Sequence, residues 1–178
     1  MHITRERLKG AYSEGEALAI YKEVKDTNDF IHFAQKFMHD KDYQVARNAL
    51  WGLTKATDKE LSQLQPILHE LIDLSLSTEN SSVRRLSLNV ILRLEIKEED
   101  LRTDFFDFCL EHMVNLEELP GIQSLCIKLA YHMASFYPEL MGEFMRILNS
   151  MDMVYYKPAV ISIRRNILSG KYKIKRKV

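Results

Sequence analysis

The feature that most constrains this chain is a nine-residue apolar pattern that recurs four times at a nearly constant interval. The copies occupy residues 45–53, 83–91, 122–130 and 160–168, and their first residues are 38, 39 and 38 positions apart. Positions one, four, eight and nine of every copy are apolar or glycine, except at Asn48. Steps of three, four, seven and eight residues place these positions on one face of an α-helix. The pattern therefore predicts four similar amphipathic helices in a repeating architecture.

Each of these helices follows another apolar segment with helical periodicity, so the helices come in pairs. We expect the first helices of the pairs near residues 28–39, 66–77, 101–116 and 138–150. Pro66, Pro138 and Pro158 fit the first turn of a helix, where the missing N–H costs nothing. Position six of the pattern is apolar in three copies and becomes Arg165 in the last. An internal repeat packs against neighbours on both sides, whereas a terminal one does not, so the stack is expected to end at the fourth pair.

We expect a single domain over residues 1–178. Its predicted parts are an N-terminal helical cap over 1–26, helix pairs over 28–56, 66–95, 101–135 and 138–170, and a basic tail over 171–178. Ser13 with Glu16 has the spacing of a capping box and predicts a helix start within the N-terminal cap. Thr57 with Glu60 has the same spacing and predicts a short extra turn before the second pair.

Two helices in each unit of about 38 residues resemble the HEAT and armadillo repeat families. The pair Val83-Arg84 is similar to the Val-Arg that begins many HEAT second helices, although the other three copies have a different second residue. The resemblance covers residues 28–170. It implies an all-α fold, an α–α superhelix of about four HEAT/ARM-like helix pairs after the N-terminal cap. It also implies second helices that line a concave surface, and it brings no catalytic residues.

The charges of the chain balance in number and are separated in sequence. There are 25 Lys plus Arg and 25 Asp plus Glu. The windows 43–57, 81–94, 121–135 and 157–170 contain the second helices, and their 58 residues include nine Lys or Arg and no Asp or Glu. Random placement would put about eight acids there. Further basic residues in the tail are Lys171, Lys173, Lys175, Arg176 and Lys177. The second helices are therefore expected to present a basic surface.

Positions three, seven and eleven of each copy point away from the predicted core, and we call them the inner positions. They are Arg47, Trp51 and Lys55; Arg85, Asn89 and Arg93; Ser124, Lys128 and His132; and Ser162, Asn166 and Gly170. The candidate partner-binding residues among them are Arg47, Trp51, Lys55, Arg85, Arg93, Lys128 and His132. Trp51, the only tryptophan, suits stacking or the anchoring of a peptide. The alternative is that Trp51 packs on the N-terminal cap.

These observations favour a non-catalytic binding module or scaffold whose basic concave face holds an acidic protein segment. The alternative partner is nucleic acid, because a basic groove can follow a row of phosphates. A third interpretation requires no ligand. Cations near helix C-termini and acids in first turns complement the helix dipole, and the stems of Arg and Lys cover apolar surface.

One class of enzymes is similar to this chain in architecture. Residues 80–85 are similar to repeats of the bacterial DNA alkylation-repair glycosylases, whose HEAT-like fold has a basic concave face with aromatic residues and a carboxylate. This chain has one candidate aromatic residue, Trp51, and no carboxylate on its second helices. Glycosylase activity is therefore not expected, whereas non-catalytic DNA binding remains the alternative function.

The remaining features predict no metal, cofactor or membrane site. No apolar run approaches the ~18 residues of a membrane span, and the N-terminus has no apolar core of a secretory signal. Cys109 and Cys126 make no disulfide framework, which favours a reducing cytoplasm, and their distances from the turn near residues 115–119 suggest two buried thiols close together. No two of the six histidines have the four-residue spacing of a zinc site. The sequence does not specify an oligomeric state.

Overall fold

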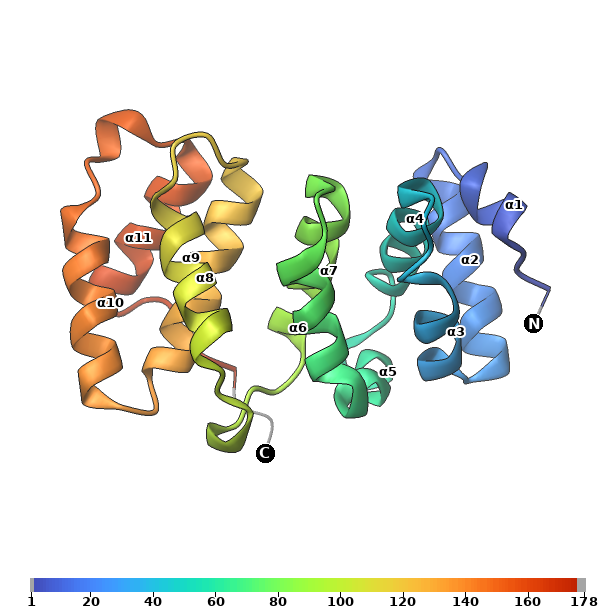
Figure 1. Cartoon of the computed structure of the whole chain (residues 1–178), viewed down its shortest axis with the longest axis horizontal. Coiled ribbons are helices and arrows are strands. Elements are labelled where there is room, and N and C mark those ends of the chain that lie inside the picture. Colours follow the sequence, from blue (N-terminus) through green and yellow to red (C-terminus); the bar gives the residue numbers. More distant parts are fainter. Residues whose placement is uncertain (1, 176–178) are drawn as a thin grey trace. The chain divides into compact units, whose positions relative to one another are not determined.

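The computed structural model describes residues 2–175, which form α-helices and short 3-10 helices with no β-strand among them (Figure 1). The predicted all-α fold is therefore confirmed. Contacts within the chain define two compact units, one ending at Leu94 and the other beginning at Glu95. This boundary falls at the end of the second predicted helix pair. The single domain predicted over residues 1–178 stays a prediction.

The N-terminal unit begins with two helices, α1 (Arg5–Lys9) and α2 (Glu14–Thr27). The capping box predicted at the start of α2 is confirmed. The Ser13 hydroxyl accepts the Glu16 backbone N–H, and the Glu16 carboxylate accepts the Ser13 backbone N–H. The residues predicted as an N-terminal cap thus form two helices with one buried side each.

Two helix pairs complete the N-terminal unit: α3 (Phe30–Phe37) with α4 (Tyr43–Leu53), and α6 (Leu68–Ser77) with α7 (Ser81–Arg93). Between the pairs lie α5 (Asp58–Leu61), which begins at the predicted Thr57 capping box, and the 3-10 helix η1 (Ser62–Ile67). Pro66 lies inside η1, and α6 begins only at Leu68, so the prediction that Pro66 starts α6 is wrong. Tighter 3-10 turns are frequent at the start of an α-helix, and one of them holds this proline.

Helix α4 packs against α1, α2, α3 and α7, and its two departures from the apolar pattern occur at the first two of these contacts. Asn48 is buried, and its Nδ2 donates to the Leu8 carbonyl of α1 at 2.6 Å. A Cβ added at Gly52 would lie 2.7 Å from Cγ2 of Ile20 in α2. The first copy therefore has a polar residue and a glycine where it meets the N-terminal helices.

The C-terminal unit contains two more pairs: α8 (Thr103–Val114) with α9 (Pro120–Ala134), and α10 (Pro138–Ser150) with α11 (Pro158–Leu168). Short 3-10 helices, η2 (Glu98–Asp100) and η3 (Met153–Tyr155), precede α8 and α11. Pro138 and Pro158 occupy the first turns of their helices, as predicted. Helix α9 packs against α8, α10 and α11. Within this unit, Figure 1 shows α8 and α10 nearer the viewer than α9 and α11.

The four-fold apolar pattern corresponds to the buried sides of α4, α7, α9 and α11. Every residue at positions one, four, eight and nine is buried except Leu168, which ends α11. At position six, Leu50, Leu88 and Ile127 are fully buried, whereas Arg165 is exposed. The second apolar side therefore disappears in the last copy, as predicted for the end of a stack.

Candidate functional site

Arg93, one of the predicted partner-binding residues, binds the end of the preceding second helix. Its Nε donates to Oδ1 of Asp58 at 2.8 Å, and its Nη1 donates to the Thr54 carbonyl at 3.0 Å. Its Nη2 donates to the Ala56 carbonyl. The last carbonyls of a helix have no partners within the helix, and these two lie just beyond the end of α4. Arg93 thus caps α4 and ties it to α7.

Two more arginines have the same kind of partner, Arg84 on α7 itself and Arg164 on α11. Arg84 Nε donates to the Ser75 carbonyl at 3.1 Å, near the end of α6. Arg164 Nε donates to the Leu148 carbonyl at 2.9 Å, near the end of α10. Cations placed at helix C-termini complement the helix dipole as well as the unpaired carbonyls. Some of the basic side chains of the second helices therefore bind helix ends within the fold.

The three predicted residues on α4 also have internal partners. Lys55 forms an ion pair with Glu14 at the start of α2, and its Nζ lies 5.7 Å from the centroid of the Trp51 ring. Arg47 donates from Nε to Oδ1 of Asn48 at 3.0 Å. Trp51 is half-buried. The structure therefore places these residues along one helix and uses both cations in contacts within the N-terminal unit.

Arg85 differs from the other candidates of the N-terminal unit. It lies on α7, its side chain is exposed, and it forms no ion pair or hydrogen bond with the residues that the structure describes. Among the five predicted residues of this unit, Arg85 is the one whose charged group has no partner among the described residues, so it is available to a binding partner.

In the C-terminal unit, the chain turns sharply after α11 and returns toward the inner positions. Gly170 has a φ of +72°, its N–H bonds to the Ile167 carbonyl at 3.1 Å, and the Lys171 N–H bonds to the Asn166 carbonyl at 2.9 Å. This pair of bonds is the Schellman motif, in which glycine adopts the left-handed conformation at little cost. The turn directs residues 171–175 back along the unit.

Tyr172 fixes the returning segment to α9. Its hydroxyl lies 2.9 Å from Nε2 of His132, and its ring centroid is 5.7 Å from that of Tyr131 and 5.9 Å from that of His132. Burial and, to a smaller extent, the positive charge of Lys128 together lower the pKa of His132 to about 4. Burial also raises the pKa of Tyr172 to about 12. Both side chains are therefore neutral at pH 7, and the predicted partner contact at His132 is occupied by the chain's own tail.

Exposure alternates along this tail. Lys171, Lys173 and Lys175 are exposed, whereas Tyr172 and Ile174 between them are partly buried. We call the three lysines the tail row. Neither the tail row nor Lys128 on α9 forms an ion pair with a described residue. The inner positions of the fourth copy, Ser162, Asn166 and Gly170, carry no charge.

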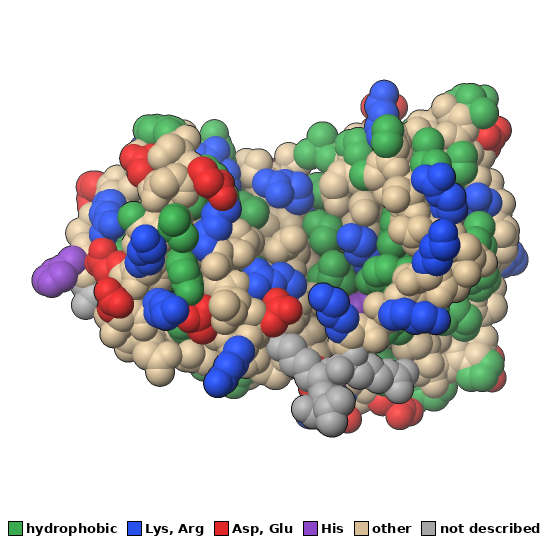
Figure 2. Space-filling model, turned by 180° about the vertical axis from the view of Figure 1, so that it is seen from behind, with side chains coloured by type: hydrophobic (Ala, Val, Ile, Leu, Met, Phe, Trp, Pro, Cys, Tyr) green, Lys and Arg blue, Asp and Glu red, His purple; other side chains and the backbone are tan. Residues whose placement is uncertain are grey.

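The tail row and Lys128 together form what we call the basic site. No Asp or Glu follows Asp152, and the 26 residues after it contain eight Lys or Arg. Figure 2, which views the chain from behind Figure 1, shows Lys and Arg side chains over the C-terminal unit and its Asp and Glu mostly at the edges. The prediction of a basic tail extended to Arg176 and Lys177, which lie outside the described residues. The turn signal at Gly170 and the alternation of lysine with Tyr172 and Ile174 could have indicated the docked tail from sequence.

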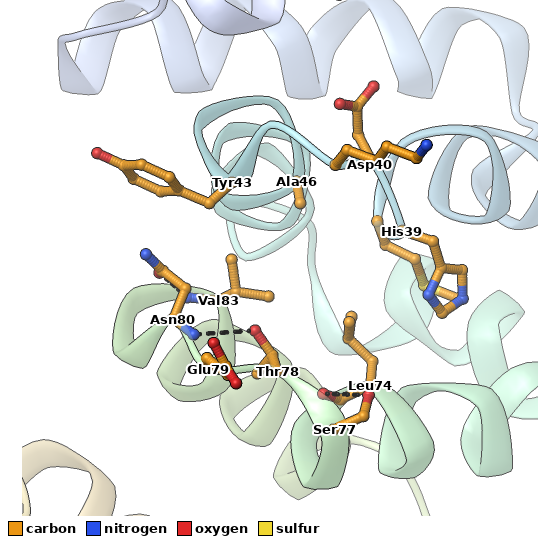
Figure 3. A pocket seen from close by; sticks show the side chains of 12 residues that line it. His39, Asp40, Tyr43, Ala46, Leu74, Ser77, Thr78, Glu79, Asn80 and Val83 are labelled. Atoms are coloured by element: carbon orange, nitrogen blue, oxygen red, sulfur yellow. Dashed lines mark hydrogen bonds between the residues drawn. The ribbon is translucent and has the colours of Figure 1, made fainter.

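A separate groove lies in the N-terminal unit between the α3–α4 and α6–α7 loops, with a volume of about 590 Å³. Figure 3 shows Tyr43 and His39 at its opposite ends, with Ala46, Val83 and Leu74 between them. Lys41, Asp40 and Glu79 also line it, so it has both signs of charge. Mixed charge gives the groove no preference for an anionic partner.

The cysteines and histidines form no further chemical site. Cys109 and Cys126 are both buried free thiols, and burial together with a hydrogen bond to Cys126 raises the pKa of the Cys109 thiol well above its usual value. A thiol with a raised pKa is a poor nucleophile. Among residues 2–175, no group of three or more His, Cys, Asp or Glu side chains is placed to hold a metal ion. No helix in this part of the chain is long and apolar enough to cross a membrane.

The repeat geometry agrees with a comparison to protein families. The family model of the HEAT repeat domain matches residues 4–171, which is nearly the whole chain. The chain belongs to the HEAT repeat family. HEAT repeats are commonly scaffolds for protein interactions, and the family is generally non-catalytic. No curated protein and no solved structure matches this HEAT repeat chain significantly.

Proposed function

We propose that this HEAT repeat chain is a non-catalytic binding module whose basic site holds an acidic segment of a partner protein. The observation that carries the proposal is a set of lysines on the C-terminal unit, the exposed tail row and the half-buried Lys128. Lys128 and the tail row have no ion pair with a described residue, whereas Lys55 and Arg93 of the N-terminal unit have one. A cation without an internal partner is available to a ligand.

The charge of the rest of the chain favours a short acidic segment over a long polyanion. The formal net charge of the chain is zero, because the acids outside the second helices offset the basic residues. Domains that bind nucleic acid usually have a clear excess of positive charge. A protein segment of a few residues can bind the basic site alone, and the site itself contains no Asp or Glu.

Binding of single-stranded nucleic acid is the second candidate, and the exposure of the tail row favours it. Three cations along one segment can contact successive phosphates of a flexible strand. No carboxylate lies among the residues of the basic site, so this candidate also predicts binding without catalysis.

A titration can separate the two candidates. A fluorescently labelled ten-residue peptide with five glutamates is titrated with the protein at several salt concentrations, and an oligonucleotide with a similar number of charges is titrated in parallel. We expect peptide binding that weakens as salt rises, because the contacts are exposed ion pairs. Tighter binding of the oligonucleotide would favour the second candidate, and the absence of binding to either would contradict both.

A charge-matched pair of variants locates the site. The triple variant Lys171→Gln, Lys173→Gln, Lys175→Gln removes the tail row. The control Lys22→Gln, Lys36→Gln, Lys59→Gln removes three exposed charges from the N-terminal unit. Three exposed ion pairs at ~0.2–1 kcal/mol each predict a loss on the order of tenfold in affinity for the first variant alone. Equal losses in both would show that net charge, and not the basic site, controls binding.

A further inference from the structure

The position of Tyr172 determines which way the lysines on either side of it face. Two contacts fix the Tyr172 side chain: its hydroxyl is hydrogen-bonded to His132, and its ring packs against Tyr131. The Schellman turn at Gly170 fixes the backbone immediately before it. With Tyr172 and Ile174 facing the unit, the tail row faces away from it.

This arrangement sets the spacing of the charges. Exposure alternates along residues 171–175, as it does along an extended backbone, on which side chains two residues apart lie on the same side and about 6.6 Å from each other. The tail row therefore presents three cations at a regular interval, on a segment whose backbone freedom has already been reduced by docking. An extended partner chain has the same two-residue repeat, so carboxylates at alternate positions can meet the lysines in register.

We propose that Tyr172 is a positioning residue that holds the tail row in order, and that the site selects an extended segment with a carboxylate at every second residue. This inference rests on the proposed function and adds to it the pattern of the partner. Tyr172 acts through the lysines and need not touch the partner itself. A freely moving tail would carry the same charge without distinguishing one arrangement of acids from another.

The test uses two peptides of identical composition and different order. One alternates glutamate with serine over ten residues, and the other has five serines followed by five glutamates. We expect the wild-type chain to bind the alternating peptide several-fold more tightly than the block peptide. In Tyr172→Ala the two affinities should become equal, mainly through weaker binding of the alternating peptide.

Three further variants complete the test. Tyr172→Phe keeps the ring contacts and should retain part of the preference. Gly170→Ala opposes the left-handed turn at φ +72° and should reduce the preference by a second route. Tyr155→Ala, in the same unit and with a tyrosine that is 67% exposed, is the matched control and should bind like the wild type. Circular dichroism establishes that each variant keeps its helices.

The outcomes distinguish failure of the positioning role of Tyr172 from failure of the proposed function. Binding of neither peptide by the wild type would overturn the proposed function itself. Binding of both peptides with equal affinity, or an unchanged preference in Tyr172→Ala, would overturn the positioning role while leaving the proposed function in place. Tighter binding in Tyr172→Ala would also overturn it, because the tail would then be covering the site.

Discussion

Arg93→Ala is expected to destabilise the N-terminal unit, although sequence alone assigned this residue to partner binding. The guanidinium lies between α7 and the segment that follows α4, and the side chain is 23% exposed. Removing it breaks the ion pair with Asp58 and the two bonds to the carbonyls of Thr54 and Ala56.

The size of the effect follows from those three contacts. Asp58 is 55% exposed, so its ion pair contributes at most about 1 kcal/mol. Each bond to a carbonyl contributes roughly 0.5–1.5 kcal/mol, and water can reach part of the site after truncation. The expected loss is therefore about 2 kcal/mol. For a chain of this length, that corresponds to a decrease of about 4–8 °C in the melting temperature.

Arg85→Ala on the same helix is the matched control. Arg85 is exposed and has no internal partner among the described residues, so its removal should change stability by less than about 0.5 kcal/mol. Thermal unfolding of the two variants is followed by circular dichroism at 222 nm under identical conditions. Equal melting temperatures for Arg93→Ala and Arg85→Ala would refute the assignment of Arg93 as a cap of α4.

Two more predictions test the packing and the anchor. Gly142→Ala should raise the melting temperature, because alanine favours the helix by ~1 kcal/mol and nothing lies within 4 Å of the new Cβ. Gly52→Ala should be ~1–3 kcal/mol less stable than Gly142→Ala, because its new Cβ meets the Ile20 side chain. Equal shifts of the two melting temperatures would contradict the α2–α4 contact. Between pH 6.5 and about 4, an unfolded His132 binds a proton that the folded one does not, so stability should decrease as the pH falls through this window, by at most ~3 kcal/mol. A melting temperature that depends on pH equally in wild type and His132→Gln would contradict this.

The repeat could be predicted from sequence because burial imposes the same apolar positions on each copy. The two departures from the apolar pattern, at Asn48 and Gly52, could not be explained from the repeat alone. Asn48 occupies an apolar position because its amide reaches the Leu8 carbonyl, 40 residues earlier in the chain. Gly52 is required by the approach of α2, which no local pattern reveals.

The separation of charge was also visible in the sequence, whereas the use of each charge was not. Arg85 and Arg93 look equivalent as inner positions of one helix, and only the fold shows that Arg93 has carbonyl partners 37 and 39 residues away. His132 was predicted to face a partner, and it lies against Tyr172 of the same chain. The partner-binding roles of all seven candidate residues stay predictions.

Hydrogen exchange with and without a saturating acidic peptide tests the central proposal most directly. We expect slower exchange in the peptide's presence for the backbone amides of residues 171–175 and for the end of α9 around His132, with little change in α4. Slower exchange confined to α4 and α7 would contradict binding at the basic site, and so would peptide binding that leaves exchange at residues 171–175 unchanged.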